Sequence, residues 1–490
     1  VTGVQTCALP ISLPLIPHSK LKIQNCHPST HPPIHPHTPM NTLFFRLLDA
    51  EDKGIALQQA IAALPQNPTP EAFTVNPKSF EQVPGATFAY WVGNKLLNSF
   101  IKYSLLETED RNAVVGIQTS DDFRFVRTFW EVEIDKSDAF LPLAKGGKFS
   151  RFYSNIYLLI NWDQDGKEIH AFPKSYVRNS DFYFRYGLTW TSRTTSELSV
   201  RTIPSDCIFA HKGPGIFFAS NQINELLSLL SLTNSKIFQS LVEVQLAAAD
   251  TAARSYEVGV IQRTPVPKLN PEQKDILATL ARRAWSLKRN LDTITQTSHA
   301  FILPALLQVQ GATLSDRAQA WAETVAATEQ ELADIQAKID ALAFELYGIS
   351  PEEVGGEKPG ERSQESEADV DDEDEDDAVE GADLPSLVHG LVEYALGVAF
   401  GRFDLRLATG EREHPPEPEP FDPLPACSPG MLVVERSEEA EGRSQNSEVR
   451  SQPDNLPPCP PSPLPPISEA DLPPNYPIAI PFNGILVDDE

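Results

Sequence analysis

Residues 116–131 read GIQTSDDFRFVRTFWE and carry polar groups suited to binding a nucleic acid. The first residues of this stretch suit a tight turn, because they are small or carry amides: Gly116, Gln118, Thr119 and Ser120. The amide of Gln118 could read the edge of a base, and the guanidinium groups of Arg124 and Arg127 could hold phosphate or guanine. The alternative is a turn and a strand with core aromatic residues, in which the two arginines pair with Asp121, Asp122 or Glu131.

The segment from Lys145 to Lys212 is locally basic, with ten Lys or Arg against six Asp or Glu. Aromatic residues are interleaved with these cations, and this combination suits stacking on bases and binding of phosphates. Aromatic residues alone would also suit sugar stacking or a β-sheet core. The Gly146-Gly147 pair marks a turn that lets a backbone approach closely. Together with Gln118, Thr119, Arg124 and Arg127, the candidate DNA-binding residues are Lys145, Lys148, Arg151, Arg185 and Arg193.

Composition limits the protein to a few classes. The 490 residues have a net charge of −28, which by itself argues against a nucleic-acid binder. About half of that negative excess lies in residues 352–383, so charge must be judged segment by segment. The 43 prolines and a hydrophobic content of 41% indicate a folded portion diluted by loops and tails.

Several kinds of site are not indicated. The five cysteines are far apart and form no CxxC pair, so neither a zinc site nor a disulfide framework is expected, and the pattern suits a reducing cytoplasm. No apolar run approaches the ~20 residues that a membrane helix needs. Residues 1–12 resemble the translation of a sequencing adapter, and residues up to 39 are rich in Pro and His without fixed metal geometry. We expect 1–39 to be a non-native, disordered leader.

Hydrophobic spacing predicts the elements of the first half of the chain. Helices are expected over residues 41–64 and 89–106, the second with an apolar face: Leu96, Leu97, Phe100, Ile101 and Leu105. Aromatic and β-branched residues predict strands over 115–119, 124–134 and 155–162. The Asp165-Gly166 pair predicts a hairpin within 160–169.

Helices dominate the predicted second half. Residues 222–248 indicate a helix, a break at Asn234-Ser235 and a second helix, followed by a strand within 256–267. Asn270, Pro271 and Gln273 form a capping box with proline at the first helical position, which predicts a helix to about residue 291.

A longer helix is predicted from about Ser315 to Gly348, a left-handed cap. Its apolar-leaning positions alternate four and three apart: Trp321, Val325, Thr328, Leu332, Ile335, Ile339, Leu342 and Leu346. This stripe could pack against the preceding helix as an antiparallel hairpin or against another chain, and the neighbour in sequence favours the hairpin.

The end of the chain alternates ordered and low-complexity stretches. We expect residues 351–383 to be a disordered acidic linker, 384–409 to be a helix, and 410–490 to be an irregular, proline-rich tail. His389 lies on the helix and is expected to be a surface or core residue.

Six stretches in order resemble the target-recognition region of large adenine-specific DNA methyltransferases, namely the BREX-type phage-resistance methylases and the type IIG restriction–modification enzymes. They are residues 116–131, KGGKFSRFYSN at 145–155, INWDQDGKEI at 160–169, DFYFRYGLTWT at 181–191, LTNSK at 232–236 and YEVGVIQRTPVP at 256–267. Later stretches that begin at residues 292, 394 and 480 also resemble this family. The resemblance implies double-stranded DNA as a partner and, for the intact enzyme, S-adenosylmethionine as the cofactor.

The catalytic signature of that family is missing from this sequence. Neither a glycine-rich cofactor loop nor an Asn-Pro-Pro-Tyr/Phe motif is found, and LPPNYP at 472–477 has the letters in the wrong order. The resemblance therefore implies a cytoplasmic fragment that needs a missing methyltransferase domain and works with other defence-system subunits. No catalytic, cofactor-binding or metal-binding residue is expected in this chain.

The expected fold is α+β. A mixed β-sheet target-recognition domain at 85–268 would follow a short helix and linker at 40–84 and precede a helical hairpin or spacer at 269–350. Two alternatives remain open, a stand-alone specificity or interaction subunit and a carbohydrate-binding module.

Overall fold

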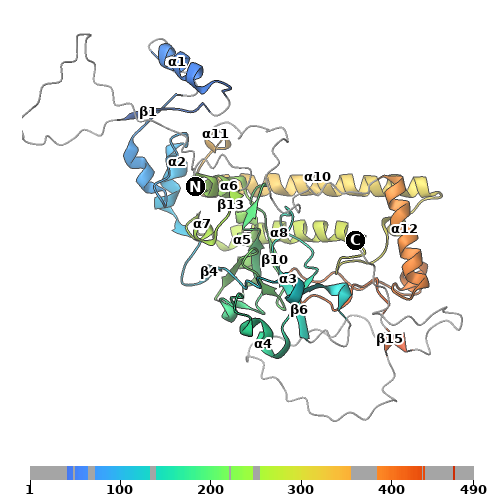
Figure 1. Ribbon diagram of the computed structural model, residues 1–490. Helices are drawn as coiled ribbons and strands as arrows, with labels where there is room; N and C mark the ends of the chain where they lie inside the picture. Colours follow the sequence, from blue (N-terminus) through green and yellow to red (C-terminus); the bar gives the residue numbers. More distant parts are fainter. Residues whose placement is uncertain are drawn as a thin grey trace, which may run out of the picture.

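The computed structural model describes residues 41–47, 50–64, 72–132, 139–219, 222–246, 254–354 and 383–432, together with two short strand segments beyond them. It confirms the α+β class (Figure 1). The expectations for the leader at 1–39, most of the acidic run and most of the proline-rich tail lie outside the described residues.

The N-terminal part differs from the single helix expected over 41–64. Strand β1 (Thr42–Phe45) pairs antiparallel with β2 (Ala72–Val75), and only α1 (Lys53–Ala63) is helical. The aromatic residues of β1 decide this, because Phe44 stacks on Tyr90 and contacts Phe80 edge-on. The 3-10 helix η1 (Pro77–Gln82) carries Phe80.

The first of two four-stranded sheets is wholly antiparallel, with the strand order β10-β8-β12-β4. Its strands are β4 (Arg111–Val114), β8 (Gly187–Trp190), β10 (Val200–Ile203) and β12 (Gly215–Phe218). Side chains alternate between its faces. Trp190 and Val200 join the large core shared with the helices, whereas Ile203 and Phe217 join a second core on the opposite face.

The second sheet covers that opposite face and has the order β11-β6-β7-β5. Its strands are β5 (Val126–Thr128), β6 (Phe140–Ala144), β7 (Leu158–Asn161) and β11 (Ile208–Phe209), with β11 parallel to β6. The strand predicted within 155–162 is confirmed. The strand predicted over 124–134 is shorter than expected, because α3 (Asp122–Phe125) precedes β5 and the 3-10 helix η2 (Phe129–Glu131) follows it. Residues 115–119 form isolated bridges only.

The predicted hairpin at 160–169 is wrong. After β7 the chain enters α4 (Asp163–Ala171), whose start includes the left-handed residues Gln164, Asp165 and Gly166. Gly166 lies against the ring of Trp162, and Ile169 is fully buried in the second core. Burial of Ile169 requires the chain to turn back as a helix, so the Asp-Gly pair serves helix entry instead of a β-turn.

Two further expectations need correction beside the first sheet. The helix expected over 89–106 is α2 (Asn94–Lys102), and the next residues form β3 (Ser104–Leu105), paired with β14 (Pro265–Val266). Ile101 is 68% exposed, so it does not belong to the buried face. The strand expected within 256–267 is mostly α7 (Val258–Gln262), which packs on α6 (Lys236–Leu246).

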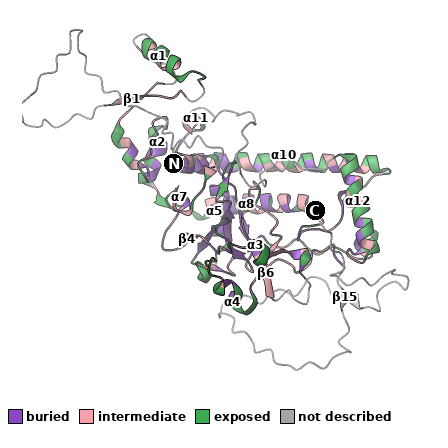
Figure 2. Ribbon diagram, viewed as in Figure 1, coloured by how far each residue is buried: buried purple, intermediate pink, exposed green. Residues whose placement is uncertain are grey.

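The helix-break-helix pattern is confirmed, with α5 (Ile223–Thr233) and α6 on either side of Asn234 and Ser235. Helix α8 (Pro271–Asp292) has the predicted capping box, and α10 (Leu314–Tyr347) ends at Gly348 in the left-handed conformation. Figure 2 shows that the sheet and the helices beside it hold most of the buried residues.

Helices α8 and α10 lie side by side and antiparallel, as the hairpin interpretation predicts (Figure 1). Arg283 of α8 pairs with Glu331 of α10 at 2.7 Å, and Ile335 and Ile339 are buried in the shared core. Leu332 is only partly buried. Helix α8 also lies along α5, so the hairpin packs against the helices beside the first sheet.

The C-terminal helix is broken where one helix was expected over 384–409. Helix α12 (Leu384–Ala399) ends before Gly401, and α13 (Leu405–Thr409) follows. His389 is exposed and lies 3.7 Å from Glu393. The remaining elements are α9 (Ala305–Gln308), α11 (Pro351–Val354), η4 (Ser180–Phe182), β9 (Arg193–Thr194) paired with β13 (Arg254–Ser255), and β15 (Val434–Glu435) paired with β16 (Ile467–Ser468).

Residues 410–432 are irregular, as expected, but they are not an exposed tail. Phe421 is 5% exposed and packs against Tyr186. The backbone amide of Leu424 donates to a carboxylate oxygen of Asp206 at 3.1 Å. The segment is therefore part of the folded unit.

Candidate nucleic-acid interface

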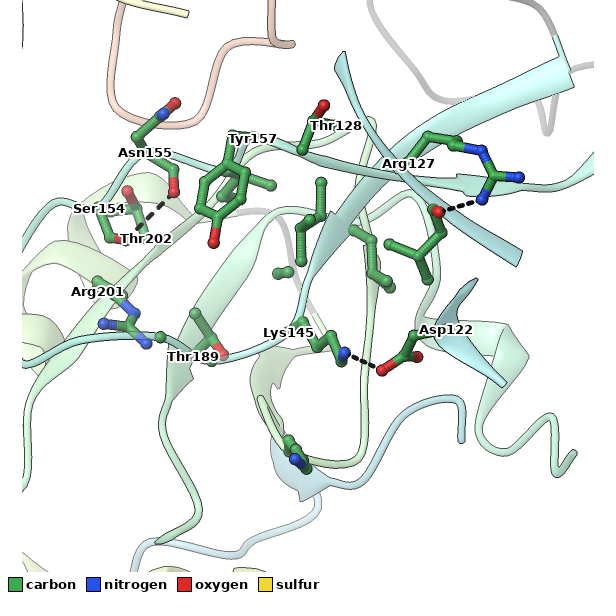
Figure 3. Close-up of a pocket in the computed structure, with 18 of the residues that line it drawn as sticks. Asp122, Arg127, Thr128, Lys145, Ser154, Asn155, Tyr157, Thr189, Arg201 and Thr202 are labelled. Atoms are coloured by element: carbon green, nitrogen blue, oxygen red, sulfur yellow. Dashed lines mark hydrogen bonds and ion pairs between the residues drawn. The ribbon is translucent and has the colours of Figure 1, made fainter. Parts of the chain in front are cut away.

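A cleft of about 300 Å³ lies between the two sheets (Figure 3). The first sheet supplies Thr189 and Arg201, and the second supplies apolar residues such as Leu143 and Leu158. The Gly146-Gly147 turn after β6 forms part of the wall. Strand pairing places these residues together although they are far apart in the sequence.

Basic side chains outnumber acidic ones in this cleft. Four cationic residues line it, Arg127, Lys145, Arg201 and Lys212, against Asp122 and Glu131. Arg127 and Lys145 were predicted as DNA-binding residues. Arg201 and Lys212 were not, although a charged residue inside the apolar stretch Val200–Ile203 was a visible signal.

Asp122 forms an ion pair with Lys145 and accepts a hydrogen bond from the hydroxyl of Thr119 (Figure 3). Burial would raise the pKa of Asp122, but the hydrogen bonds from Lys145 and Thr119 and the charge of Lys212 lower it overall. Both lysines therefore act on one carboxylate at the mouth of the cleft, which stays ionised at neutral pH.

Arg201 is the buried cation of the site, with 2% of its surface exposed. One terminal nitrogen donates to the carbonyl of Lys148 at 2.7 Å, and the other donates to the hydroxyl of Thr191 at 2.7 Å. The guanidinium group thus holds the end of the glycine turn. Gly146 and Gly147 have φ values of 97° and 128°, a region that favours glycine.

The structure gives Gly116 a different role from the tight turn expected at 116–120. A Cβ atom on Gly116 would lie 1.8 Å from the carbonyl oxygen of Phe209, so close backbone packing explains this glycine. The backbone of Gln118 pairs with Tyr176, and its side chain donates to the Ser120 hydroxyl at 3.3 Å. Thr119 is buried.

The other predicted cations lie outside the lining of the cleft. Arg124 pairs with Glu168, with its Nε at 2.9 Å, instead of the acids near it in sequence. Arg151 pairs with Glu197 at 2.7 Å. Arg185 donates to the carbonyl of Phe218, Arg193 is exposed on β9, and the carbonyl of Lys148 is the acceptor for Arg201. Arg127, which does line the cleft, donates to the carbonyls of Phe123 and Val126 at 2.6 Å.

An aromatic pair stands at the rim. The rings of Trp130 and Tyr157 are stacked, with centroids 6.0 Å apart, and Tyr157 is 41% exposed. Behind them, Phe129 stacks on the buried ring of His299 at 4.0 Å. Burial lowers the pKa of His299 to about 4, against the opposing effect of backbone groups of Pro425 and Ile156. This histidine is therefore neutral at physiological pH.

The described ranges hold neither a cluster of metal ligands nor a membrane-spanning helix. No group of three or more His, Cys, Asp or Glu that could hold a metal ion is found there. Within the same ranges, no helix has both the length and the apolar character needed to span a bilayer.

Comparison with known proteins links the chain to adenine-specific methyltransferases. It is 25% identical over 389 residues to the adenine-specific methyltransferase PglX of Lacticaseibacillus casei (strain Zhang), a match that covers 74% of this chain and 30% of that protein. It is also 25% identical over 334 residues to the adenine-specific methyltransferase BrxX of Escherichia coli O9:H4 (strain HS), covering 66% of this chain and 26% of that protein. The matches thus span less than a third of each relative. No protein-family model matches.

Among solved structures, the chain is similar to the type IIL restriction–modification enzyme MmeI in complex with DNA. The TM-score is 0.32 at 15% identity, over 50% of this chain and 34% of that one.

Proposed function

We propose that this chain provides DNA target recognition to a site-specific adenine-N6 DNA methyltransferase of a phage-defence or restriction–modification system. The cleft between the two sheets and its rim would contact double-stranded DNA. Methyl transfer from S-adenosylmethionine would need a catalytic domain with the Asn-Pro-Pro-Tyr/Phe motif, which this sequence does not contain. The similarity to PglX and BrxX supports the enzyme class.

The observation that carries the proposal is the basic cleft in an otherwise acidic protein. The whole chain has a net charge of −28, yet four cations and two acids line this cavity. Confined positive charge of this kind is what DNA-binding faces use to neutralise phosphates. The exposed ring of Tyr157 at the rim adds a surface on which a base can stack.

The residues would have different roles. Lys145 and Arg127, in the cleft, would contact phosphates and bind all sequences alike. Lys148, Arg151, Arg185 and Arg193 would extend this contact on neighbouring surfaces. Gln118, which carries both a donor and an acceptor, would read a base edge from the adjacent turn with Thr119 and Arg124 beside it.

Titration with a fluorescent duplex at several salt concentrations tests the DNA contact. Lys145→Ala should weaken binding to every sequence and reduce the salt dependence by roughly one phosphate contact. Lys338→Ala removes an exposed lysine on α10, far from the cleft in sequence and absent from its lining, and should change neither quantity. Wild-type binding that does not respond to salt would exclude this function.

The recognition-only role has its own test. The purified chain is incubated with duplex DNA and labelled S-adenosylmethionine, and no label should enter the DNA. Incorporation above background would show that the chain carries catalytic residues that its sequence motifs do not reveal.

A further inference from the structure

Thr189 occupies an unusual position at the floor of the cleft. It lies within β8, and only 2% of its surface is exposed. Its hydroxyl has no hydrogen-bond partner in the part of the chain that the structure describes. A buried hydroxyl without a partner costs about 1–3 kcal/mol, and valine would fill the same position on a strand without that cost.

The neighbour of Thr189 across the sheet is Arg201. The two residues are direct register partners in the antiparallel β8–β10 pair, so their side chains lie on the same face. Both line the cleft (Figure 3). A hydroxyl donor and a buried guanidinium group therefore stand side by side.

The glycine turn lies close to this pair. A Cβ atom on Gly147 would lie 4.0 Å from a terminal nitrogen of Arg201, at van der Waals distance. Lys145 precedes the turn, and the carbonyl of Lys212 lies 3.1 Å from the position of a Cβ on Gly146. The turn thus joins two cations to the Thr189–Arg201 floor.

We propose that this floor is a phosphate-binding subsite that holds one phosphodiester of the DNA backbone. Thr189 would donate its hydroxyl to the phosphate, and Arg201, Lys145 and Lys212 would supply the positive charge. The inference rests on the proposed function and goes beyond it, because it assigns the deepest contact to two residues inside strands instead of the predicted turn.

Thr189→Val tests the subsite, because it removes the hydroxyl and keeps the shape of the side chain. The variant should be as stable as the wild type or more stable in urea, and it should bind duplex DNA about tenfold more weakly, the size of effect expected when a hydrogen bond to a charged group is lost. Thr189→Ser should retain the wild-type affinity. Thr233→Val, at a buried threonine in α5, should leave DNA affinity unchanged.

The outcomes separate the subsite from the proposed function. Salt-dependent duplex binding that is equal in Thr189→Val and wild type would overturn the subsite and leave the DNA function standing, as expected if a water molecule satisfies the hydroxyl. Absence of salt-dependent wild-type binding would overturn both.

Inorganic phosphate tests whether the subsite binds the DNA backbone or free phosphate. Thermal stabilisation of the wild type by millimolar phosphate, lost in Thr189→Val, together with duplex binding, would support the subsite. The same stabilisation without any duplex binding would assign the site to a free phosphate and overturn the backbone assignment.

Discussion

Buried polar groups on the two faces of the β10-β8-β12-β4 sheet differ in whether they have hydrogen-bond partners. On the helix face, the side-chain amide of Asn234 both accepts from the Val200 amide at 2.9 Å and donates to the Val200 carbonyl at 2.8 Å. The indole of Trp285 donates to the hydroxyl of Thr202 at 3.1 Å. On the cleft face, the Thr189 hydroxyl is unmatched among the described residues.

This difference separates stability from binding. Because β10 is an edge strand, its outward backbone groups need partners. Asn234 supplies them to Val200 as an additional strand would, and the backbone of Phe152 hydrogen-bonds to Val200 and Thr202. The cleft face instead keeps polar groups and cations where a ligand can meet them. Substitutions on the helix face should therefore change unfolding, and substitutions on the cleft face should change DNA affinity.

A large effect is expected for Asn234→Ala. The change leaves the buried amide of Val200 without its partner, at about 1–3 kcal/mol, whereas the Val200 carbonyl still accepts from the backbone amide of Phe152 at 2.9 Å. Urea denaturation should show a loss of about 1–3 kcal/mol. Asn224→Ala, at an exposed residue of α5, should stay within about 0.5 kcal/mol of the wild type. An Asn234→Ala protein of full stability would remove the strand-like role of the amide.

The stripe of α10 offers the next comparison on the helix side. Ile339 is fully buried and Leu332 is only partly buried. Ile339→Ala should cost about 2–5 kcal/mol, and Leu332→Ala should cost clearly less because solvent already reaches part of its side chain. Melting temperatures of the two variants compare the two losses of stability. Equal losses would mean that the two positions are packed alike.

The buried side chains of Asp206 and His299 should have opposite effects on the pH dependence of stability. Burial raises the pKa of Asp206 to about 6 and lowers that of His299 to about 4. Protonated Asp206 stabilises the fold at low pH, and this contribution is lost as pH rises through about 6. Neutral His299 contributes stability above pH 6.5, which is lost as pH falls through about 4. Each contribution is about 3 kcal/mol, so they largely cancel.

Single substitutions should reveal how each residue changes the free energy of unfolding with pH. Asp206→Asn should make the free energy of unfolding fall more steeply than in the wild type between pH 6.5 and pH 4, because the histidine contribution is then unopposed. His299→Gln should reverse that difference over the same interval. Urea denaturation at several pH values checks both, and parallel profiles for all three proteins would refute the two assignments.

The smallest predicted effect concerns the acid at the mouth of the cleft. Asp122→Asn removes the negative charge that pairs with Lys145 and lies near any bound phosphate. Duplex affinity should rise roughly fivefold at low salt, since charges ~4 Å apart in water interact by ~1 kcal/mol. The gain should shrink as salt increases. Glu168→Gln removes the partner of Arg124 outside the cleft and should change affinity less.

Local interactions explain which expectations for the fold succeeded. The cap at Asn270, the left-handed end at Gly348 and the apolar stripe of α10 each depend on residues within a few positions of one another. The same logic failed at residues 160–169, where the turn signal of Asp165-Gly166 was overridden by burial of Ile169.

The candidate site depended on contacts that spacing does not encode. Lys145 and Arg127 were expected near DNA because a basic, aromatic segment surrounds them, and both line the cleft. Arg201 stood out as a charge in an apolar stretch, but nothing in the sequence placed it beside Lys145. The pattern of alternating residues reveals that a strand has two faces, but it does not reveal which element covers each face.

By itself, the sequence determined the α5–α6 pair, the cap of α8, the end of α10 and the basic character of residues 145–212, because propensity, capping and charge are local properties. Only the tertiary structure decided that Thr189 and Arg201 stand opposite each other beneath the Gly146-Gly147 turn. Strand register and the packing of one sheet on another set that geometry, and both arise from contacts between residues that are distant in the chain.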